Sequence, residues 1–302
     1  MSAALSALLD GIIDYAGLFP PAKLDLETAL RTYFKHLKGP EKWLVSRFVC
    51  PAGELTNLGE LLKDYKGEPV LVTVIGSRAT SVSELRQVAE QDAEAIQTFH
   101  GETDGAAEVQ AYETRAIHDV PIGKCVDILS PLAELDVFLE VPWSDHQVDD
   151  LHAIAEHDWL GAKGRTGGLV PPEFPSASAL AVFLHECMSL DLRFKLTAGM
   201  HHPLRHYDAL IGAHQHGFLN VACAATLIEA MDFSKSEVEE VLLNENPGSF
   251  VFGSDSFAYN NLEVDLASIE DMRSLFLSYG SCSVEDPILG LASLGLIQVG
   301  SR

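Results

Sequence analysis

The stretch WLGAKGRTGG, residues 159–168, has the pattern of a short strand that runs into a glycine turn, yet it carries two cations, Lys163 and Arg165. Further along the chain, RFKLTAGMHHP (193–203) again places a lysine, Lys195, in an apolar strand just before a glycine. The whole chain has 20 basic against 44 acidic residues. Cations in two apolar strands of so acidic a chain therefore need a structural or chemical reason.

Short apolar runs like these two alternate with amphipathic runs over most of the chain. The runs with the composition of strands are 11–17, 43–49, 70–76, 106–112, 136–141, 160–165, 193–199 and 217–221. Helical spacing of apolar residues lies between them, at 24–38, 81–100, 146–157 and 176–190. This alternation predicts a parallel sheet covered by helices on both faces, and eight strands are the number in a (β/α)8 TIM barrel. A doubly wound open sheet is the alternative, but no GxGxxG motif follows the first strand.

The predicted barrel occupies residues 1–231. Residues 232–302 contain a charged helix at 236–245, an apolar segment at 249–253 and another helix at 265–278. We expect this second part to be a C-terminal extension that packs on the barrel.

Composition excludes several classes of partner. The formal net charge is -24, which argues against nucleic acid and anionic membranes because both attract positive surfaces. The five cysteines are scattered without a CxxC pair, as expected for reduced thiols in a cytoplasmic protein. The N-terminus lacks the basic region of a signal peptide, and no apolar run is long enough to span a membrane. The sequence leaves homo-oligomerisation open.

Side chains alternate along a strand, so polar residues two apart share a face. Lys163 and Arg165 share one face of their strand, Lys195 and Thr197 share one face of the next, and Glu140 lies on the polar face of the strand before. The apolar faces should pack against helices, so we expect these polar side chains to point to the barrel axis near the carboxyl ends of the strands, where barrel enzymes keep their active sites. The same rule predicts five more inward polar residues: Asp14, Arg47, Gln110, Tyr112 and Asn220.

Two lysines on adjacent strands suggest a specific chemistry. Neighbouring strands lie about 4.8 Å apart, so the amines of Lys163 and Lys195 could interact. A nearby cation lowers the pKa of a lysine, and a neutral amine attacks carbonyl groups. The pair therefore predicts a Schiff base at one lysine, with Glu140 or His201 carrying protons.

The motifs KGRTG (163–167) and KLTAG (195–199) resemble the Schiff-base strand and the following strand of deoxyribose-phosphate aldolase, a class I aldolase barrel. The resemblance implies that Lys163 forms the Schiff base and that Lys195 depresses its pKa. It also implies that Thr166, Gly167 and Gly199 shape the pocket. Glu140 is the candidate for the proton transfer that an aspartate performs in that family.

Over its whole length the chain resembles a family of bacterial proteins of about this size to which no activity is assigned. Five motifs carry this resemblance: DYAGLFPPA (14–22), GAKGRTGG (161–168), TAGMHHPL (197–204), HGFLNV (216–221) and GSCSVEDP (280–287). They are markers of the family and imply no reaction.

The glycine turns after the two lysine strands can bind anions. Backbone N–H groups at Gly167, Gly168 and Gly199 are expected to lie at helix entrances, and Arg165 can clamp a carboxylate or phosphate bidentately. The predicted substrate is therefore a small anionic carbonyl or phosphorylated compound. An aldolase-type reaction through lysine needs no cofactor.

Two alternatives of other classes stay open. Glu140, His201 and His202 could hold a divalent metal ion in a metal-assisted lyase or isomerase, with the lysines binding substrate oxyanions. The barrel could instead bind a small anion without catalysis. We interpret Cys282, in GSCS, as a buried small hydrophobic residue in preference to a nucleophile.

Overall fold

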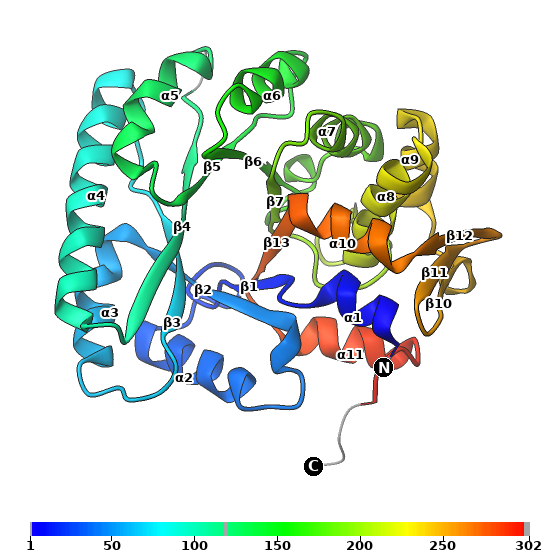
Figure 1. Cartoon of the computed structure of the whole chain (residues 1–302), viewed down its shortest axis with the longest axis horizontal. Helices are drawn as coiled ribbons and strands as arrows, with labels where there is room; N and C mark the ends of the chain where they lie inside the picture. The colour runs from blue at the N-terminus through cyan, green and yellow to red at the C-terminus, as the bar shows by residue number, and fades with distance from the viewer. Residues whose placement is uncertain (1, 118–119, 299–302) are drawn as a thin grey trace.

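The computed structural model describes residues 2–117 and 120–298. Eight parallel strands close into a barrel in the order β1-β13-β7-β6-β5-β4-β3-β2, and helices surround it (Figure 1). This confirms the predicted (β/α)8 TIM barrel. The barrel strands are β1 (Ile13–Tyr15), β2 (Val45–Pro51), β3 (Val70–Ile75), β4 (Ala107–Arg115), β5 (Asp136–Glu140), β6 (Leu160–Arg165), β7 (Phe194–Thr197) and β13 (Phe276–Ser281).

Most of the helices lie between consecutive barrel strands (Figure 1). They are α1 (Ala3–Leu9), α2 (Leu26–Leu37), α3 (Leu55–Leu62), α4 (Val82–Thr103), α5 (Gly123–Leu129), α6 (Gln147–Ala155), α7 (Ala177–Ser189), α8 (Phe218–Met231), α9 (Lys235–Leu243), α10 (Leu266–Leu275) and α11 (Glu285–Ser293). The hydroxyls of Ser81 and Ser176 accept hydrogen bonds from the first turns of α4 and α7, which fixes where these helices begin. Within the described part of the chain, no helix combines the length and apolarity needed to cross a membrane.

Seven of the predicted strands coincide with barrel strands, but the eighth, 217–221, is wrong. Residues 218–228 form the first three turns of α8, and every one of them is buried. A helix that is apolar all round has no amphipathic period, so its sequence cannot be told from a buried strand.

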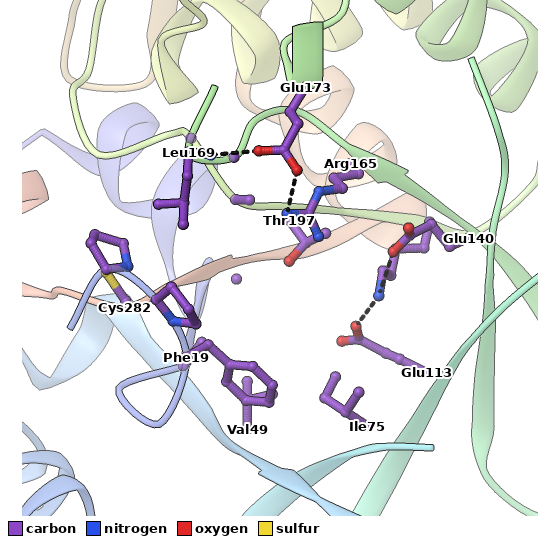
Figure 2. Close-up of a pocket in the computed structure, with 18 of the residues that line it drawn as sticks. Phe19, Val49, Ile75, Glu113, Glu140, Arg165, Leu169, Glu173, Thr197 and Cys282 are labelled. Atoms are coloured by element: carbon purple, nitrogen blue, oxygen red, sulfur yellow. Dashed lines mark hydrogen bonds and ion pairs between the residues drawn. The ribbon is translucent and has the colours of Figure 1, made fainter. Parts of the chain in front are cut away.

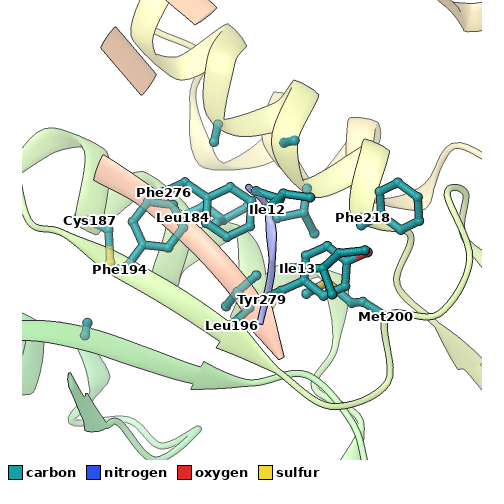
Figure 3. Close-up of a cluster of buried hydrophobic side chains, with 14 of the residues drawn as sticks. Ile12, Ile13, Leu184, Cys187, Phe194, Leu196, Met200, Phe218, Phe276 and Tyr279 are labelled. Atoms are coloured by element: carbon teal, nitrogen blue, oxygen red, sulfur yellow. The ribbon is translucent and has the colours of Figure 1, made fainter. Parts of the chain in front are cut away.

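The eighth strand is β13, which lies between β7 and β1. Its Phe276 stacks on Phe194 of β7 with ring centroids 4.9 Å apart, and its Tyr279 stacks on Phe218 of α8 at 5.5 Å (Figure 3). The predicted helix 265–278 includes the first residues of this strand, because α10 ends at Leu275 and β13 begins at the next residue with no loop between them. The chain after residue 231 therefore completes the barrel, and the predicted boundary between barrel and extension does not hold.

The remaining elements decorate the barrel. The predicted helix 236–245 is α9, and the apolar segment 249–253 contains β10 (Phe250–Phe252), which pairs with β11 (Ser256–Tyr259). The strand β12 (Leu262–Asp265) completes this small antiparallel sheet, which Figure 1 shows beside α8 and α10 at the edge of the molecule. A second small sheet follows β7 and consists of β8 (His206–Asp208) and β9 (Ala213–Gln215).

A bulge in β4 interrupts the alternation of inward and outward side chains close to the site. The register between β3 and β4 shifts between Val72 and Thr73, where β4 has one extra residue. An extra residue exchanges the inward and outward faces of the strand beyond it. The hydroxyl of Tyr112 therefore points out and donates to Asp92 of α4 at 2.8 Å, whereas Glu113 points into the barrel. The prediction of an inward Tyr112 is wrong for this reason.

The corrected position of Asn220 leads to a stability prediction. Its fully buried amide accepts from the backbone N–H of Arg205 and donates to the carbonyls of Val241 and Asn244. Asn220→Ala leaves these buried groups unpaired, so we expect the free energy of unfolding to fall by roughly 2–4 kcal/mol. Urea unfolding measures this change.

The exposed Asn57 of α3 is the matched control, and Asn57→Ala should alter the free energy of unfolding by less than about 0.5 kcal/mol. Equal effects of the two substitutions would contradict a structural role for Asn220.

Candidate active site

Glu113 joins two buried lysines at the centre of the barrel. The Nζ of Lys163 lies 2.8 Å from one oxygen of its carboxylate, and the Nζ of Lys195 lies 2.5 Å from the other. The side chains of all three residues are at most 7% exposed. The two amines that the sequence placed side by side are therefore held by a common anion.

Two more carboxylates extend this arrangement in both directions. The Nζ of Lys195 lies 2.5 Å from Asp14 of β1, and that of Lys163 lies 3.0 Å from Glu140 of β5. The result is a chain of alternating charges, Asp14–Lys195–Glu113–Lys163–Glu140, which we call the ion-pair chain. Five different strands contribute one member each.

The ion-pair chain sets the charge of its members. Burial alone would raise the pKa of Glu113, but the ammonium groups of Lys163 and Lys195 outweigh it and hold this pKa at about 2. Burial would likewise lower the pKa of Lys163, but Glu113 and Glu140 outweigh it and raise this pKa above its ordinary value. The predicted depression of the Lys163 pKa by Lys195 is therefore wrong, because a carboxylate separates the two amines.

A pocket of about 230 Å³ opens above the ion-pair chain at the carboxyl ends of the strands (Figure 2). Glu113, Glu140 and Lys163 line its base, while Lys195 lies beneath and is 1% exposed. The apolar part of the lining consists of Ala16, Phe19, Pro20, Pro21, Val49, Ile75 and Leu169. The motif DYAGLFPPA thus supplies part of this apolar lining.

The turns after β6 and β7 form one side of the pocket, but of the three residues that the aldolase resemblance named only Gly199 lines it. Gly168, Thr197 and Gly199 line it. Thr166 and Gly167 lie behind these residues. The hydroxyl of Thr166 donates to backbone carbonyls of the turn after β7, and a Cβ at Gly167 would lie only 2.8 Å from the Cα of Gly199. Thr166 and Gly167 therefore hold the two turns together.

In the turn after β6, which was predicted to bind an anion, backbone N–H groups already bind the carboxylate of Glu173. The carboxylate of Glu173 accepts the backbone N–H groups of Leu169 at 2.6 Å and Val170 at 3.3 Å. Arg165 lies 3.9 Å from the other oxygen of this carboxylate, at the rim of the pocket. The N–H of Leu169, helped by that of Val170 and by Arg165, holds the pKa of Glu173 below its ordinary value. A substrate anion at Arg165 would compete with Glu173.

Three predicted binding residues lie away from the pocket. Arg47 lies 3.8 Å from Asp14 and donates to Gln110, so it neutralises the far end of the ion-pair chain. Asp14 itself is completely buried beneath the pocket. Asn220 is a structural residue of α8, as described above, and belongs to no part of the predicted mouth.

The three candidate metal ligands are not gathered at one point. Glu140 pairs with Lys163 and Arg115, whereas the ring of the exposed His202 packs against that of His206 at 4.2 Å. His201 lines the pocket. No group of three His, Cys, Asp or Glu side chains suited to a metal ion occurs in residues 2–117 and 120–298.

The sequence interpretation missed Glu113 and Glu173. The bulge in β4 hid Glu113, although the need of two inward lysines for nearby carboxylates was a signal that a third acid should lie near them. Glu173 lies in the turn PPEF, four residues after Leu169, where no strand or helix pattern indicates the direction of its side chain.

Glu113 leads to a prediction of pH dependence. Glu113→Gln leaves two buried ammonium groups short of a counter-charge, so the free energy of unfolding at neutral pH should fall by about 3–5 kcal/mol. The folded-state pKa of about 2 lies below the ordinary 4.5. The advantage of the wild type is therefore complete above about pH 4.5 and shrinks as the pH falls toward 2, by at most about 1.4 kcal/mol per pH unit.

Urea unfolding across this pH range measures the difference. Glu90→Gln, on the exposed face of α4, is the control and should leave the unfolding curve nearly unchanged. A difference between wild type and Glu113→Gln that stays constant from pH 4.5 to 2 would show that Glu113 does not carry the charge assigned to it.

Comparison with known proteins adds no assignment. No protein-family model matches the chain, and no curated protein matches it either. The two resemblances stay predictions, and the chemistry of the site is argued from its geometry.

Proposed function

We propose that this protein is a lyase of the class I aldolase type, in which Lys163 forms an imine with a small anionic carbonyl compound. One observation carries the proposal. Lys163 is a buried lysine whose side chain lines the pocket, and it lies between the carboxylates of Glu113 and Glu140, either of which can take its proton. A lysine kept only for structure would have no need of a cavity at its amine.

Lys163 must lose a proton before it attacks a carbonyl carbon, because its pKa is raised in the resting site. The carboxylates of Glu113 and Glu140 both contact the amine of Lys163, so either of them can accept that proton. Glu140 is the more exposed of the two, at 14%. A substrate that fills the pocket excludes water from the charged pair of Lys163 and Glu140, and the loss of solvation of both charges favours transfer of the proton from Lys163 to Glu140.

The chemistry then follows from the groups that surround Lys163. The amine of Lys163 attacks the carbonyl carbon, and the protonated Glu140 gives its proton to the carbinolamine oxygen as water leaves. The resulting iminium accepts the electrons of the bond between the α and β carbons, which breaks to leave an enamine on Lys163 while Glu140, again ionised, takes the proton of the β-hydroxyl group and a carbonyl fragment departs. Glu140 returns this proton to the enamine carbon, and hydrolysis of the imine releases the second fragment. Lys195 keeps Glu113 ionised throughout, so the negative charge beside the iminium persists.

The pocket suggests the shape of the substrate. Arg165 follows Lys163 by two residues on the same face of β6 and lies nearer the mouth. A carboxylate or phosphate at Arg165 would place the neighbouring carbonyl group near the amine. The apolar lining then faces the remaining carbon atoms.

Reductive trapping tests the imine. We expect borohydride to fix a small aldehyde or 2-oxo acid on Lys163, found by mass spectrometry of peptides after a panel of such compounds is tried. Lys163→Arg should abolish the adduct, and Glu140→Gln should slow its formation by about 10²–10³-fold because the proton acceptor is lost. Lys66→Arg, at an exposed site, is the matched control. No adduct at Lys163 across the panel would overturn the proposal.

Anion binding tests the role of Arg165. Calorimetry with pyruvate and with inorganic phosphate should show weaker binding by Arg165→Ala than by the exposed-site control Arg86→Ala. Glu173→Gln should bind these anions about five- to tenfold more tightly, because it removes one like charge from the site. Binding that depends on Arg165 in a protein that never forms an adduct would favour the non-catalytic anion-binding barrel.

A further inference from the structure

A thiol, an imidazole and a carboxylate lie in line at the wall of the pocket. Cys282 follows β13 and His201 follows β7, two strands that are neighbours in the barrel, so their carboxyl ends meet at the mouth. The Sγ of Cys282 lies 3.8 Å from Nε2 of His201. The Nδ1 of the same ring lies 3.4 Å from the carboxylate of Asp286 in α11.

The thiol and the imidazole both face the pocket, because Cys282 and His201 are among its lining residues. Figure 2 shows Cys282 on the side of the pocket away from Glu113 and Glu140. Cys282 is partly exposed, whereas the other cysteines (Cys50, Cys125, Cys187 and Cys223) are buried. The proposed chemistry at Lys163 uses none of these three groups.

The carboxylate of Asp286 lies next to the ring of His201, on the side away from the thiol. A carboxylate 3.4 Å from Nδ1 favours the tautomer with the proton on that atom, which leaves the lone pair of Nε2 facing the thiol, as a general base for a cysteine requires. Burial raises the pKa of the Cys282 thiol and lowers that of His201, although Asp286 opposes the lowering. The resting pair is therefore a neutral thiol and a neutral imidazole, and the thiolate forms only as the thiol attacks.

We propose that Cys282 is a second nucleophile of this pocket, which takes an acyl group from small activated esters or thioesters. His201 is its general base, and Asp286 is a positioning residue that acts through His201. The proposal does not rest on imine formation at Lys163. It replaces our sequence interpretation of Cys282 as a merely hydrophobic residue.

The step balances without an oxidant or a cofactor. The sulfur of Cys282 bonds to the acyl carbon while the thiol proton moves to Nε2 of His201, and the bond from that carbon to the leaving alcohol or thiol breaks. The imidazolium returns the proton to the leaving group. Water then attacks the thioester, with His201 taking its proton, and releases a carboxylic acid and the free thiol.

The shape of the site fits a short acyl chain. The pocket volume of about 230 Å³ is that of a small molecule, and Phe19 and Leu169 belong to its apolar lining. An acyl chain can lie against these side chains while its carbonyl carbon reaches the thiol.

The test uses p-nitrophenyl acetate and the full-length protein. We expect a burst of nitrophenol and an acetyl group on Cys282, located by peptide mass spectrometry. Cys282→Ser should lose this adduct, and His201→Asn should slow its formation by about 10²–10³-fold. His146→Asn, at an exposed histidine, is the matched control.

Asp286→Asn should slow acylation about tenfold and move the lower midpoint of its pH profile to more acidic values, because the carboxylate that stabilises the imidazolium is gone. The charged and titratable groups that face His201 are Asp286, Cys282 and His206. If Asp286→Asn and the wild type have the same pH profile of acylation, Asp286 does not act as a positioning residue.

No acetyl group on Cys282 of the wild type, or equal rates for wild type and His201→Asn, would overturn the proposal. If His201→Asn does not fold, the adduct site in the wild type and the profile of Asp286→Asn still decide it. Peptide mapping separates a thioester on Cys282 from a reduced imine on Lys163, so either proposal can fail without the other.

Discussion

Two ammonium groups buried near the barrel axis share the single carboxylate of Glu113, and the rest of the site depends on this contact. An unpaired charge at such depth costs several kcal/mol, and Glu113 is the carboxylate that offsets this cost for Lys163 and Lys195 together. Asp14 and Glu140 then complete the pairing from β1 and β5. The ion-pair chain thereby fixes five strands relative to one another and fixes the position of the Lys163 amine below the pocket.

The same pairing determines how this amine can react. Adjacent cations would have produced a free amine at rest, but Glu113 separates them and keeps Lys163 protonated. A reaction at Lys163 must therefore begin with a proton transfer inside the ion-pair chain, and the acid nearest to solvent, Glu140, is the natural acceptor. The contacts with Glu113 and Glu140 that offset the cost of burying the Lys163 charge also raise its pKa. They therefore stabilise the fold and oppose the loss of the proton that a reaction at this amine requires. A molecule that fills the pocket and excludes water can shift the proton from Lys163 to Glu140.

Much of this could be predicted from the sequence because side-chain alternation is a local property. Lys163, Arg165 and Lys195 were placed on the inward faces of β6 and β7 from their spacing alone, and the structure has them there. The bulge in β4 was beyond such reasoning, because one extra residue is visible only in the pairing of β4 with β3. Tyr112 was therefore placed inward instead of Glu113, and the central anion of the site was missed. Local rules fail where the register between strands decides the outcome.

The assignment of the last barrel strand had a larger consequence. With 217–221 as the eighth strand, GSCSVEDP (280–287) belonged to an extension packed on the barrel, and nothing placed Cys282 at the end of a barrel strand. Because β13 is the strand between β7 and β1, this motif is instead a strand end followed by the entrance of α11. Its cysteine then meets the histidine that follows β7, although 81 positions separate the two residues in the chain. The closure of the barrel, which no local pattern encodes, brings the imidazole of His201 to within 3.8 Å of the Cys282 sulfur.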